Sequence, residues 1–205
     1  CRCYFNCYFR LMAIAINGST NVITGVAVGG LPDGIVDTDM LAADSVTAPK
    51  IGSKTFTSYA IIVDQKSSGT DGGSSSGGNW NTRDLNTELS DPDGIVSISS
   101  NQFTLQAGSY FLEAAAPSYK PNRHKLKLYQ TSGTPSDIAF GTSEFVNQDE
   151  GMQSTASLSC RFTISTATTY EIRHYIQTSK SGNGLGVGIS AGVEYFCIVK
   201  IFKEA

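Results

Sequence analysis

Residues 156–176 read ASLSCRFTISTATTYEIRHYI, and apolar side chains occupy every second position in both halves of this stretch. Successive side chains of a β-strand point to opposite faces, so this alternation predicts two half-buried strands. One predicted face carries Ala156, Leu158, Cys160, Phe162 and Ile164, and the other carries Tyr170, Ile172, His174 and Ile176.

Strand-like segments continue in both directions from this stretch. They begin near residue 54 with TFTSYAIIVDQ and include QFTLQ, SYFLEAAAP, HKLKLYQ and IAFGTSEF, separated by turn sequences such as DPDG at residues 91–94. About ten strands with turns every 8 to 12 residues and no long helix are typical of an all-β antiparallel jelly-roll sandwich.

The last segment, VEYFCIVKIF, is apolar on both faces. One core cannot cover both, so the second face is predicted to pack against another subunit. The inward set is predicted to be Val193, Tyr195, Cys197, Val199 and Ile201, and the outward set Phe196, Ile198 and Phe202.

Composition limits the class of protein. The 205 residues are 40% hydrophobic, enough for one domain with an appendage. The net charge of −3 gives no reason to expect a nucleic-acid partner, for which a domain pI above roughly 9 is the usual signal. No apolar run approaches the roughly 18 residues that span a bilayer, so we expect a soluble protein without membrane insertion.

Three segments are predicted along the chain. Residues 1–11 precede a start-like Met12 and are expected to be an upstream extension; residues 12–53 form an attachment or shaft segment, and residues 54–205 form the head domain. A helical turn is expected from Thr38 or Asp39 to Ala43. A faint ten-residue repeat, Val36 and Leu41 followed by Val46 and Ile51, favours a shaft, with a partly ordered linker as the alternative.

The five cysteines do not form a disulfide framework. Cys160 and Cys197 fall in register with apolar neighbours and are predicted to be buried thiols, with pairing across the core as the alternative. The N-terminal cluster of Cys1, Cys3 and Cys7 has no fourth ligand nearby, so no metal is expected there.

The spacing of one set of residues resembles the signature of the complement C-one-q globular-head family, which is related to tumour necrosis factor. Asp91, Phe103, Gly108 and Tyr110 match the signature. Ala114 departs from it, while Leu85, Val96 and Leu112 are apolar substitutes. The resemblance implies a homotrimeric jelly roll.

The N-terminal sequence INGSTNVITGVAVGGLPDGIVDTDML resembles the leaders of bacteriophage tail-fibre proteins, and APSYKPNRHKLKLYQTS resembles the globular tips of such proteins. This implies a virion protein of the phage tail, made in the host cytoplasm. Its N-terminal segment would contact other tail proteins, and its head would bind a glycan or protein on the host surface. A decoration or spacer protein of the virion and a secreted ligand-binding protein are the alternatives.

No enzyme is expected. Residues 188–192, GISAG, fit the GxSxG pattern of hydrolases, but that pattern requires a strand, a turn and a helix with a later histidine. The last histidine, His174, precedes Ser190. Both His174 and His124 occupy apolar registers and are predicted to be hydrogen-bonded residues of the core or of a subunit interface, with a pH-sensing role as the alternative. Residues 182–188, GNGLGVG, are predicted to be a turn, since they lack phosphate-loop spacing.

Candidate binding residues cluster near residues 119–127. Arg123, Lys125 and Lys127 share one strand face with Tyr129, and this face is predicted to point outward. Tyr119 and Lys120 precede them. The receptor-binding candidates are thus Tyr119, Lys120, Arg123, Lys125 and Lys127, which could meet anionic sugars or phosphates; solvated strand-protecting charges are the alternative.

Loops are expected to carry the binding surface: residues 66–79, a low-complexity segment predicted to be flexible, residues 117–122 and residues 147–153. No cofactor is predicted. A calcium site at Asp91 and Asp93 is the alternative to a plain β-turn, and the acidic loop at Asn147, Asp149 and Glu150 is a weaker one.

Overall fold

The computed structural model describes residues 15–17, 22–24, 55–147 and 150–205. The chain divides into two compact units, residues 1–52 and residues 53–205. In the first, β1 (Ala15–Asn17) pairs antiparallel with β2 (Val22–Thr24). The predicted helical turn, the ten-residue repeat and the cysteine cluster lie outside the described residues.

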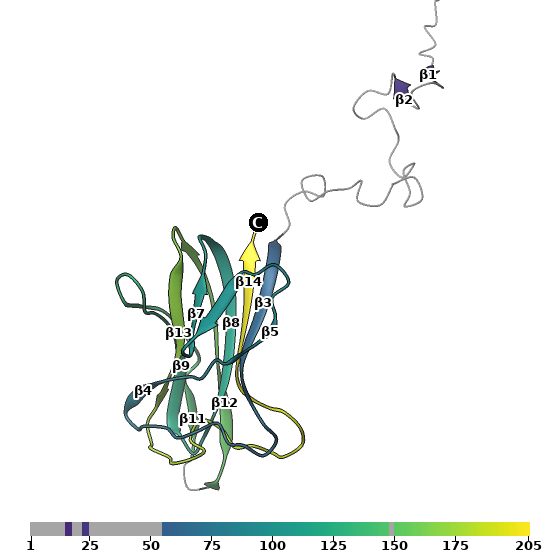
Figure 1. Cartoon of the computed structure of the whole chain (residues 1–205). Helices are drawn as coiled ribbons and strands as arrows, with labels where there is room; N and C mark the ends of the chain where they lie inside the picture. The colour runs from purple at the N-terminus through teal and green to yellow at the C-terminus, as the bar shows by residue number, and fades with distance from the viewer. Residues whose placement is uncertain (1–14, 18–21, 25–54, 148–149) are drawn as a thin grey trace, which may run out of the picture. The chain divides into compact units, whose positions relative to one another are not determined.

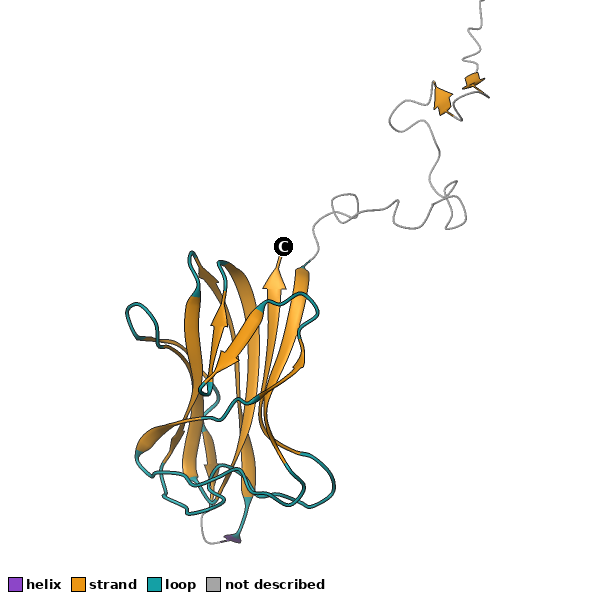
Figure 2. Cartoon of the chain, in the orientation of Figure 1, coloured by secondary structure: helices purple, strands orange, loops and turns teal. Residues whose placement is uncertain are grey.

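The second unit is a sandwich of two antiparallel sheets (Figures 1 and 2). The first sheet has the order β12, β8, β14, β3, β5. Its strands are β3 Phe56–Lys66, β5 Thr87–Ser90, β8 Gly108–Tyr119, β12 Gln153–Ile164 and β14 Glu194–Glu204. We call it the β14 sheet.

The second sheet has the order β10, β9, β13, β7, β6, with β11 paired to β9 and β4 paired to β13. Its strands are β4 Asn79–Thr82, β6 Val96–Ser99, β7 Gln102–Leu105, β9 Asn122–Gln130, β10 Ser136–Phe140, β11 Glu144–Val146 and β13 Thr168–Ile176. We call it the β9 sheet. The two sheets confirm the all-β antiparallel jelly-roll prediction.

The core lies between the two sheets and is built from alternate residues of each strand. The ring centroids of Phe103 and Tyr170 are 5.8 Å apart, those of Phe162 and Tyr170 are 5.4 Å apart, and those of Tyr110 and Phe162 are 6.0 Å apart. These contacts join β7, β8, β12 and β13 across the sandwich. The predicted inward faces of β12 and β13 are confirmed.

The predicted inward face of β14 is wrong at its first residues. Val193 and Tyr195 are exposed, whereas Phe196 and Cys197 are both buried. The register with β3 shifts between Tyr195 and Cys197, which is a β-bulge. The extra residue breaks the period of two and turns Phe196 inward.

The polar segment of residues 66–79 is organised by main-chain hydrogen bonds, which corrects the prediction of a flexible loop. The amides of Gly72, Ser75 and Gly78 donate to the carbonyls of Gly186, Lys180 and Ile176, at 2.9, 2.8 and 2.8 Å. Glycine allows the close approach: a Cβ on Gly72 would lie 2.6 Å from the Leu185 carbonyl oxygen.

Candidate functional site

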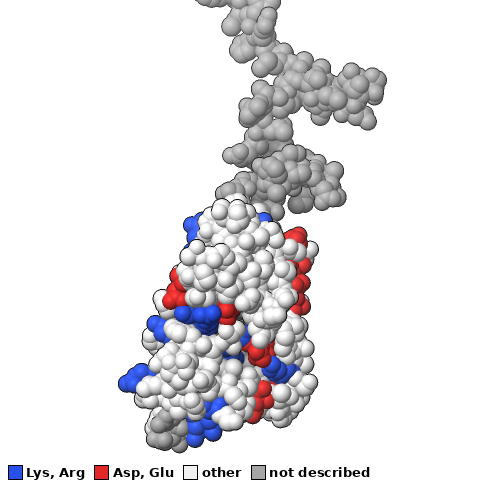
Figure 3. All heavy atoms as spheres, turned by 60° about the vertical axis from the view of Figure 1, so that its left-hand side comes forward, with Lys and Arg blue, Asp and Glu red and all other residues white. Residues whose placement is uncertain are grey.

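The outward surface of the β9 sheet alternates cations with aromatic rings, and we call it the aromatic–basic face. Along β9, His124, Leu126 and Leu128 are buried, so the residues between them point away from the core. Figure 3 shows Lys and Arg side chains in blue, with acidic groups in red among them, on the side of the head that carries β4, β9 and β13. The face consists of Arg123, Lys125, Lys127, Tyr129, Tyr175, Arg173, Trp80, Phe140 and Phe145.

In the middle of this face, the positive charges of Lys127 and Arg173 are paired with carboxylates of the protein. The Lys127 ammonium lies 2.5 Å from an Asp137 carboxylate oxygen and 4.3 Å from the centroid of the Trp80 ring. Arg173 lies 3.5 Å over the Tyr129 ring and forms an ion pair with Glu171. Lys127 is only 5% exposed. The expectation of an outward, accessible strip is therefore corrected for Lys127, because ring stacking and an ion pair cover its charge.

The other end of the face is hollow, and its two cations form no ion pair with a described carboxylate. A hollow of about 340 Å³ is lined by Arg123 and Lys125 of β9, Phe145 of β11 and Tyr175 of β13. Cross-strand pairing places these side chains together, since Phe145 is opposite Arg123 and Tyr175 is opposite Lys125. Two of the predicted residues, Arg123 and Lys125, thus line one concave site. The sequence did not indicate this hollow, because its aromatic residues come from other strands.

The remaining predicted binding residues lie at the connection between β8 and β9. Lys120 has a φ of 52° and its amide donates to the Met152 carbonyl at 3.0 Å. The ammonium groups of Lys120 and Lys180 lie 5.8 and 5.9 Å from the centroid of the Tyr119 ring. Tyr119 and Lys120 do not line the hollow.

The residues of the fold signature act within the fold. The Asp91 carboxylate accepts hydrogen bonds from the amides of Ile95 and Val96, both at 2.9 Å, and so closes the turn before β6. Phe103 and Tyr110 are fully buried, and Gly108 has a φ of 155°.

The carboxylates considered for calcium have other contacts. Asp93 accepts a hydrogen bond from the Ser58 hydroxyl, while Asp91 holds the turn. Among the residues that the structure describes, no three His, Cys, Asp or Glu side chains gather in an arrangement that could hold a metal ion.

A buried arginine, which the sequence did not reveal, connects main-chain groups of the head. Arg83 is 0% exposed, and its guanidinium donates to the carbonyls of Phe196 at 2.6 Å, Leu185 at 2.9 Å and Pro117 at 3.3 Å. Burial lowers the pKa of Arg83 and raises that of the neighbouring Cys197 thiol to about 12. Arg83 therefore joins three segments that are far apart in sequence.

The two histidines form a buried pair beside this arginine, as predicted for core residues. His124 Nδ1 lies 2.8 Å from His174 Nε2, and His124 Nε2 lies 2.7 Å from the Ser154 hydroxyl. Burial lowers the pKa of His124 to about 4 and holds that of His174 well below its ordinary value, with Arg83 acting in the same direction. Both rings are neutral at physiological pH.

The GISAG segment has no hydrolase geometry. It is a loop before β14, and one oxygen of the Glu194 carboxylate accepts hydrogen bonds from the amides of Ile189 at 2.9 Å, Ser190 at 2.8 Å and Gly69 at 3.1 Å. These bonds, that from Gly69 first, lower the pKa of Glu194. Glu194 therefore fixes the backbone of this loop.

The two cysteines of the head are free thiols, as predicted. Cys197 is buried, while Cys160 is half-buried at the edge of the core. Burial raises the pKa of the Cys160 thiol to about 11. In the described part of the chain, no helix is long and apolar enough to cross a membrane.

No protein-family model matches this chain, and no curated protein matches it by sequence. Among solved structures, murine APRIL is similar with a TM-score of 0.50 and 8% identity, covering 71% of this chain and 98% of its own. The globular domain of zebrafish complement 1qA protein is 18% identical over 72% of this chain and 97% of its own, with a TM-score of 0.47. Eiger TNF from S. frugiperda is 8% identical over 74% of this chain and 94% of its own, with a TM-score of 0.45.

The likeness to murine APRIL concerns the fold and not the activity. The strand order of the two sheets and the likeness to murine APRIL assign the head to the jelly-roll fold of complement C-one-q and tumour-necrosis-factor proteins.

Proposed function

We propose that the head is a homotrimeric binding module without enzymatic activity and that its copies meet through the outward face of the β14 sheet. The observation that carries this proposal is a cluster of three aromatic rings on that face. Phe56 and Phe202 have centroids 5.2 Å apart, and Phe111 lies 6.2 Å from each of them. Tyr59 beside them is 45% exposed. Contiguous exposed apolar patches mark protein–protein interaction sites.

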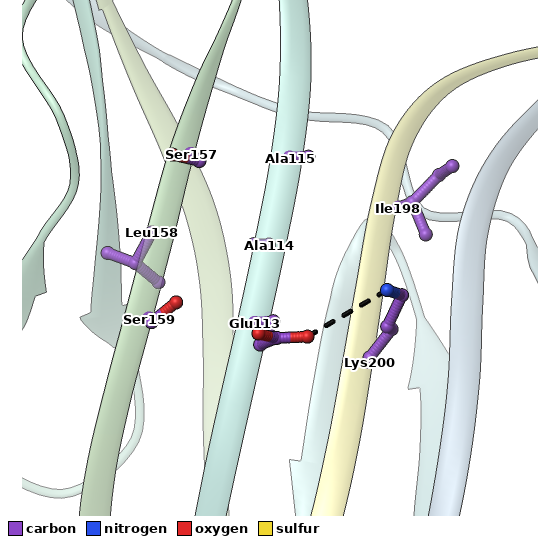
Figure 4. A pocket seen from close by; sticks show the side chains of 8 residues that line it. All are labelled: Glu113, Ala114, Ala115, Ser157, Leu158, Ser159, Ile198 and Lys200. Carbon is purple, nitrogen blue, oxygen red and sulfur yellow. Dashed lines mark ion pairs between the residues drawn. The ribbon is translucent and has the colours of Figure 1, made fainter.

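Small side chains and one ion pair continue this face along β8, β12 and β14. A hollow of about 270 Å³ there is lined by residues that include Ala115, Ser157 and Ile198, and Figure 4 shows Glu113 and Lys200 at its lower end. The Lys200 ammonium lies 3.8 Å from a Glu113 carboxylate oxygen. An alanine-rich concave surface allows close approach of another copy, and the pair gives a polar contact that can fix its register.

The first prediction is that the purified chain has a mass of about 65 kDa in light scattering, three times 21.8 kDa, and that Phe202→Lys shifts it to the monomer. A charge placed between Phe56 and Phe111 would be desolvated in the assembled interface without a partner. Circular dichroism checks that the variant is folded.

The matched control is Ile189→Lys, which introduces the same charge at an apolar residue that is 77% exposed in a loop outside this face. This variant is expected to remain trimeric. A monomeric wild-type chain at micromolar concentration contradicts the proposal.

We further propose that this module is the receptor-binding head of a phage tail fibre. The support is the resemblance of the N-terminal leader and of residues 116–132 to tail-fibre proteins, together with a concave aromatic–basic site. Three copies per fibre raise the effective affinity of weak single sites by about two to four orders of magnitude.

The test of this role is competition. Saturating amounts of the purified chain are expected to block adsorption of the parent phage to its host, and antibodies to the chain are expected to label the distal end of the tail in electron micrographs. Labelling of the capsid or collar without any block of adsorption favours the spacer alternative instead.

A further inference from the structure

The structure assigns an acidic sugar residue of a surface polysaccharide to the hollow between β9, β11 and β13. This inference rests on the proposed receptor-binding function and specifies its ligand. The hollow has a volume of about 340 Å³, within the range of roughly 300–1,000 Å³ that is typical of small-ligand sites.

Neither cation of the hollow forms an ion pair with a described carboxylate, although Glu144 also lines the hollow. Lys127 and Arg173 form ion pairs with Asp137 and Glu171 farther along the face. By contrast, no described carboxylate lies within ion-pairing distance of Arg123 or Lys125. One nitrogen of the Arg123 guanidinium donates to Gln177 at 3.0 Å, and Arg123 is exposed. An anionic group is therefore the complementary ligand at this end of the face.

The aromatic walls of the hollow fit a sugar ring better than a bare anion. The lining rings are Phe145, which is 65% exposed and lies 5.8 Å from the Arg123 guanidinium, and Tyr175. Phe140 does not line the hollow, but it is 54% exposed and lies 5.3 Å from the Lys125 ammonium. Exposed rings of this kind can stack on the apolar CH face of a sugar. Inorganic phosphate or sulfate would leave these rings in water.

The other polar groups give the hollow acceptors as well as donors. Glu144 and Ser143 line it, so hydroxyl groups of a ligand can donate to the carboxylate while an acid group meets Arg123 and Lys125. His124 also lines the hollow, but both of its ring nitrogens are engaged by His174 and Ser154. A ligand with hydroxyls, an apolar face and one negative charge satisfies all of these groups, and a uronic acid residue has that chemistry.

The test uses NMR titration of the full chain with glucuronic-acid and galacturonic-acid oligosaccharides and with the same oligosaccharides after reduction of their carboxyl groups to alcohols. We expect the acidic forms to perturb the signals of Arg123, Lys125, Phe145 and Tyr175, and the reduced forms to bind at least tenfold more weakly. Phe145→Ala and Lys125→Ala are each expected to weaken binding about tenfold. Lys203→Ala, which removes one charge from the β14 sheet, is the matched control and is expected to bind as the wild type does.

Three results overturn the inference: no perturbation of these signals by either acidic series, equal binding of acidic and reduced forms, or perturbation confined to another surface. Phage adsorption separates this inference from the proposed function. If Phe145→Ala and Lys125→Ala chains block adsorption as well as the wild type, the ligand assignment fails and receptor binding stands. If the wild-type chain does not block adsorption, the receptor role fails whatever the saccharide result.

Discussion

Replacing Arg83 with leucine is expected to lower the free energy of unfolding by about 3–5 kcal/mol, because it removes the common donor of three main-chain carbonyls, two of them in buried hydrogen bonds. The same change also affects Asp64, which is 1% exposed. Burial raises the pKa of Asp64 and the charge of Arg83 opposes that rise, so the Asp64 carboxylate loses one stabilising positive charge. Urea unfolding of the full chain at one fixed protein concentration measures the loss, since oligomer stability depends on concentration.

Arg83→Lys tests whether the geometry of the side chain matters. A lysine ammonium keeps the charge but lacks the planar fork that reaches Leu185, Phe196 and Pro117 together, so a large loss is expected here too. Arg123→Leu is the matched control, because Arg123 is exposed. This substitution is expected to lower the free energy of unfolding by less than about 1 kcal/mol. A loss below about 1 kcal/mol for Arg83→Leu would show that water or relaxation replaces its bonds.

The sequence predicted the sandwich because its strands follow a simple rule. Inward residues of β12 and β13, such as Leu158 and Ile172, recur at every second position, and that period is visible without any partner. The bulge in β14 was not predictable in this way, because it is defined by the register against β3.

Arg83 could not be predicted for a related reason. It lies in the polar sequence WNTRDLN, and arginine is almost never fully buried, so nothing in the sequence indicates a buried position. The carbonyls that accept its hydrogen bonds belong to residues 117, 185 and 196, which come together only after the sheets have formed.

The arrangement of the candidate site was also only partly visible in the sequence. Alternation along β9 placed Arg123 and Lys125 on one outward face. Their aromatic neighbours come from β11 and β13, and the pairing of Phe145 with Arg123 and Tyr175 with Lys125 depends on sheet order. Sheet order also decided that Lys127 would lie beside Asp137 and Trp80 and lose its accessibility.

Acidification from pH 7 to about pH 4.5 is expected to destabilise the head through the His124–His174 pair. Burial keeps both rings neutral in the folded state, with the pKa of His124 at about 4 against an ordinary value of 6.5. The unfolded chain therefore takes up protons first as the pH falls below about 6.5, and stability is lost from there down to about pH 4, where His124 also protonates in the folded head. For His124 alone the loss amounts to about 3 kcal/mol.

Other charged groups near the pair affect the size of this loss. Glu144 raises the pKa of His124, whereas Arg83 lowers the pKa of both rings. The lowered pKa of Glu194 adds a further loss of stability, which begins only below about pH 4.5. The raised pKa of Asp64 has the opposite effect: at pH values above about 3.8, acidification stabilises the folded head through this group. The carboxylates are unchanged when both histidines are replaced, so the difference between wild type and variant isolates the pair.

The comparison is therefore between the wild type and the double variant His124→Gln with His174→Gln, which keeps hydrogen-bonding side chains at both positions without a group that titrates in this range. Free energies of unfolding measured at pH 7, 6, 5 and 4.5 are expected to fall with pH much more steeply for the wild type than for the double variant. The variant starts from a lower stability at pH 7, because the amides fit the buried site less well than two imidazole rings in contact. Parallel pH profiles for the two chains would show that the pair does not govern acid stability, since only the histidines differ between them.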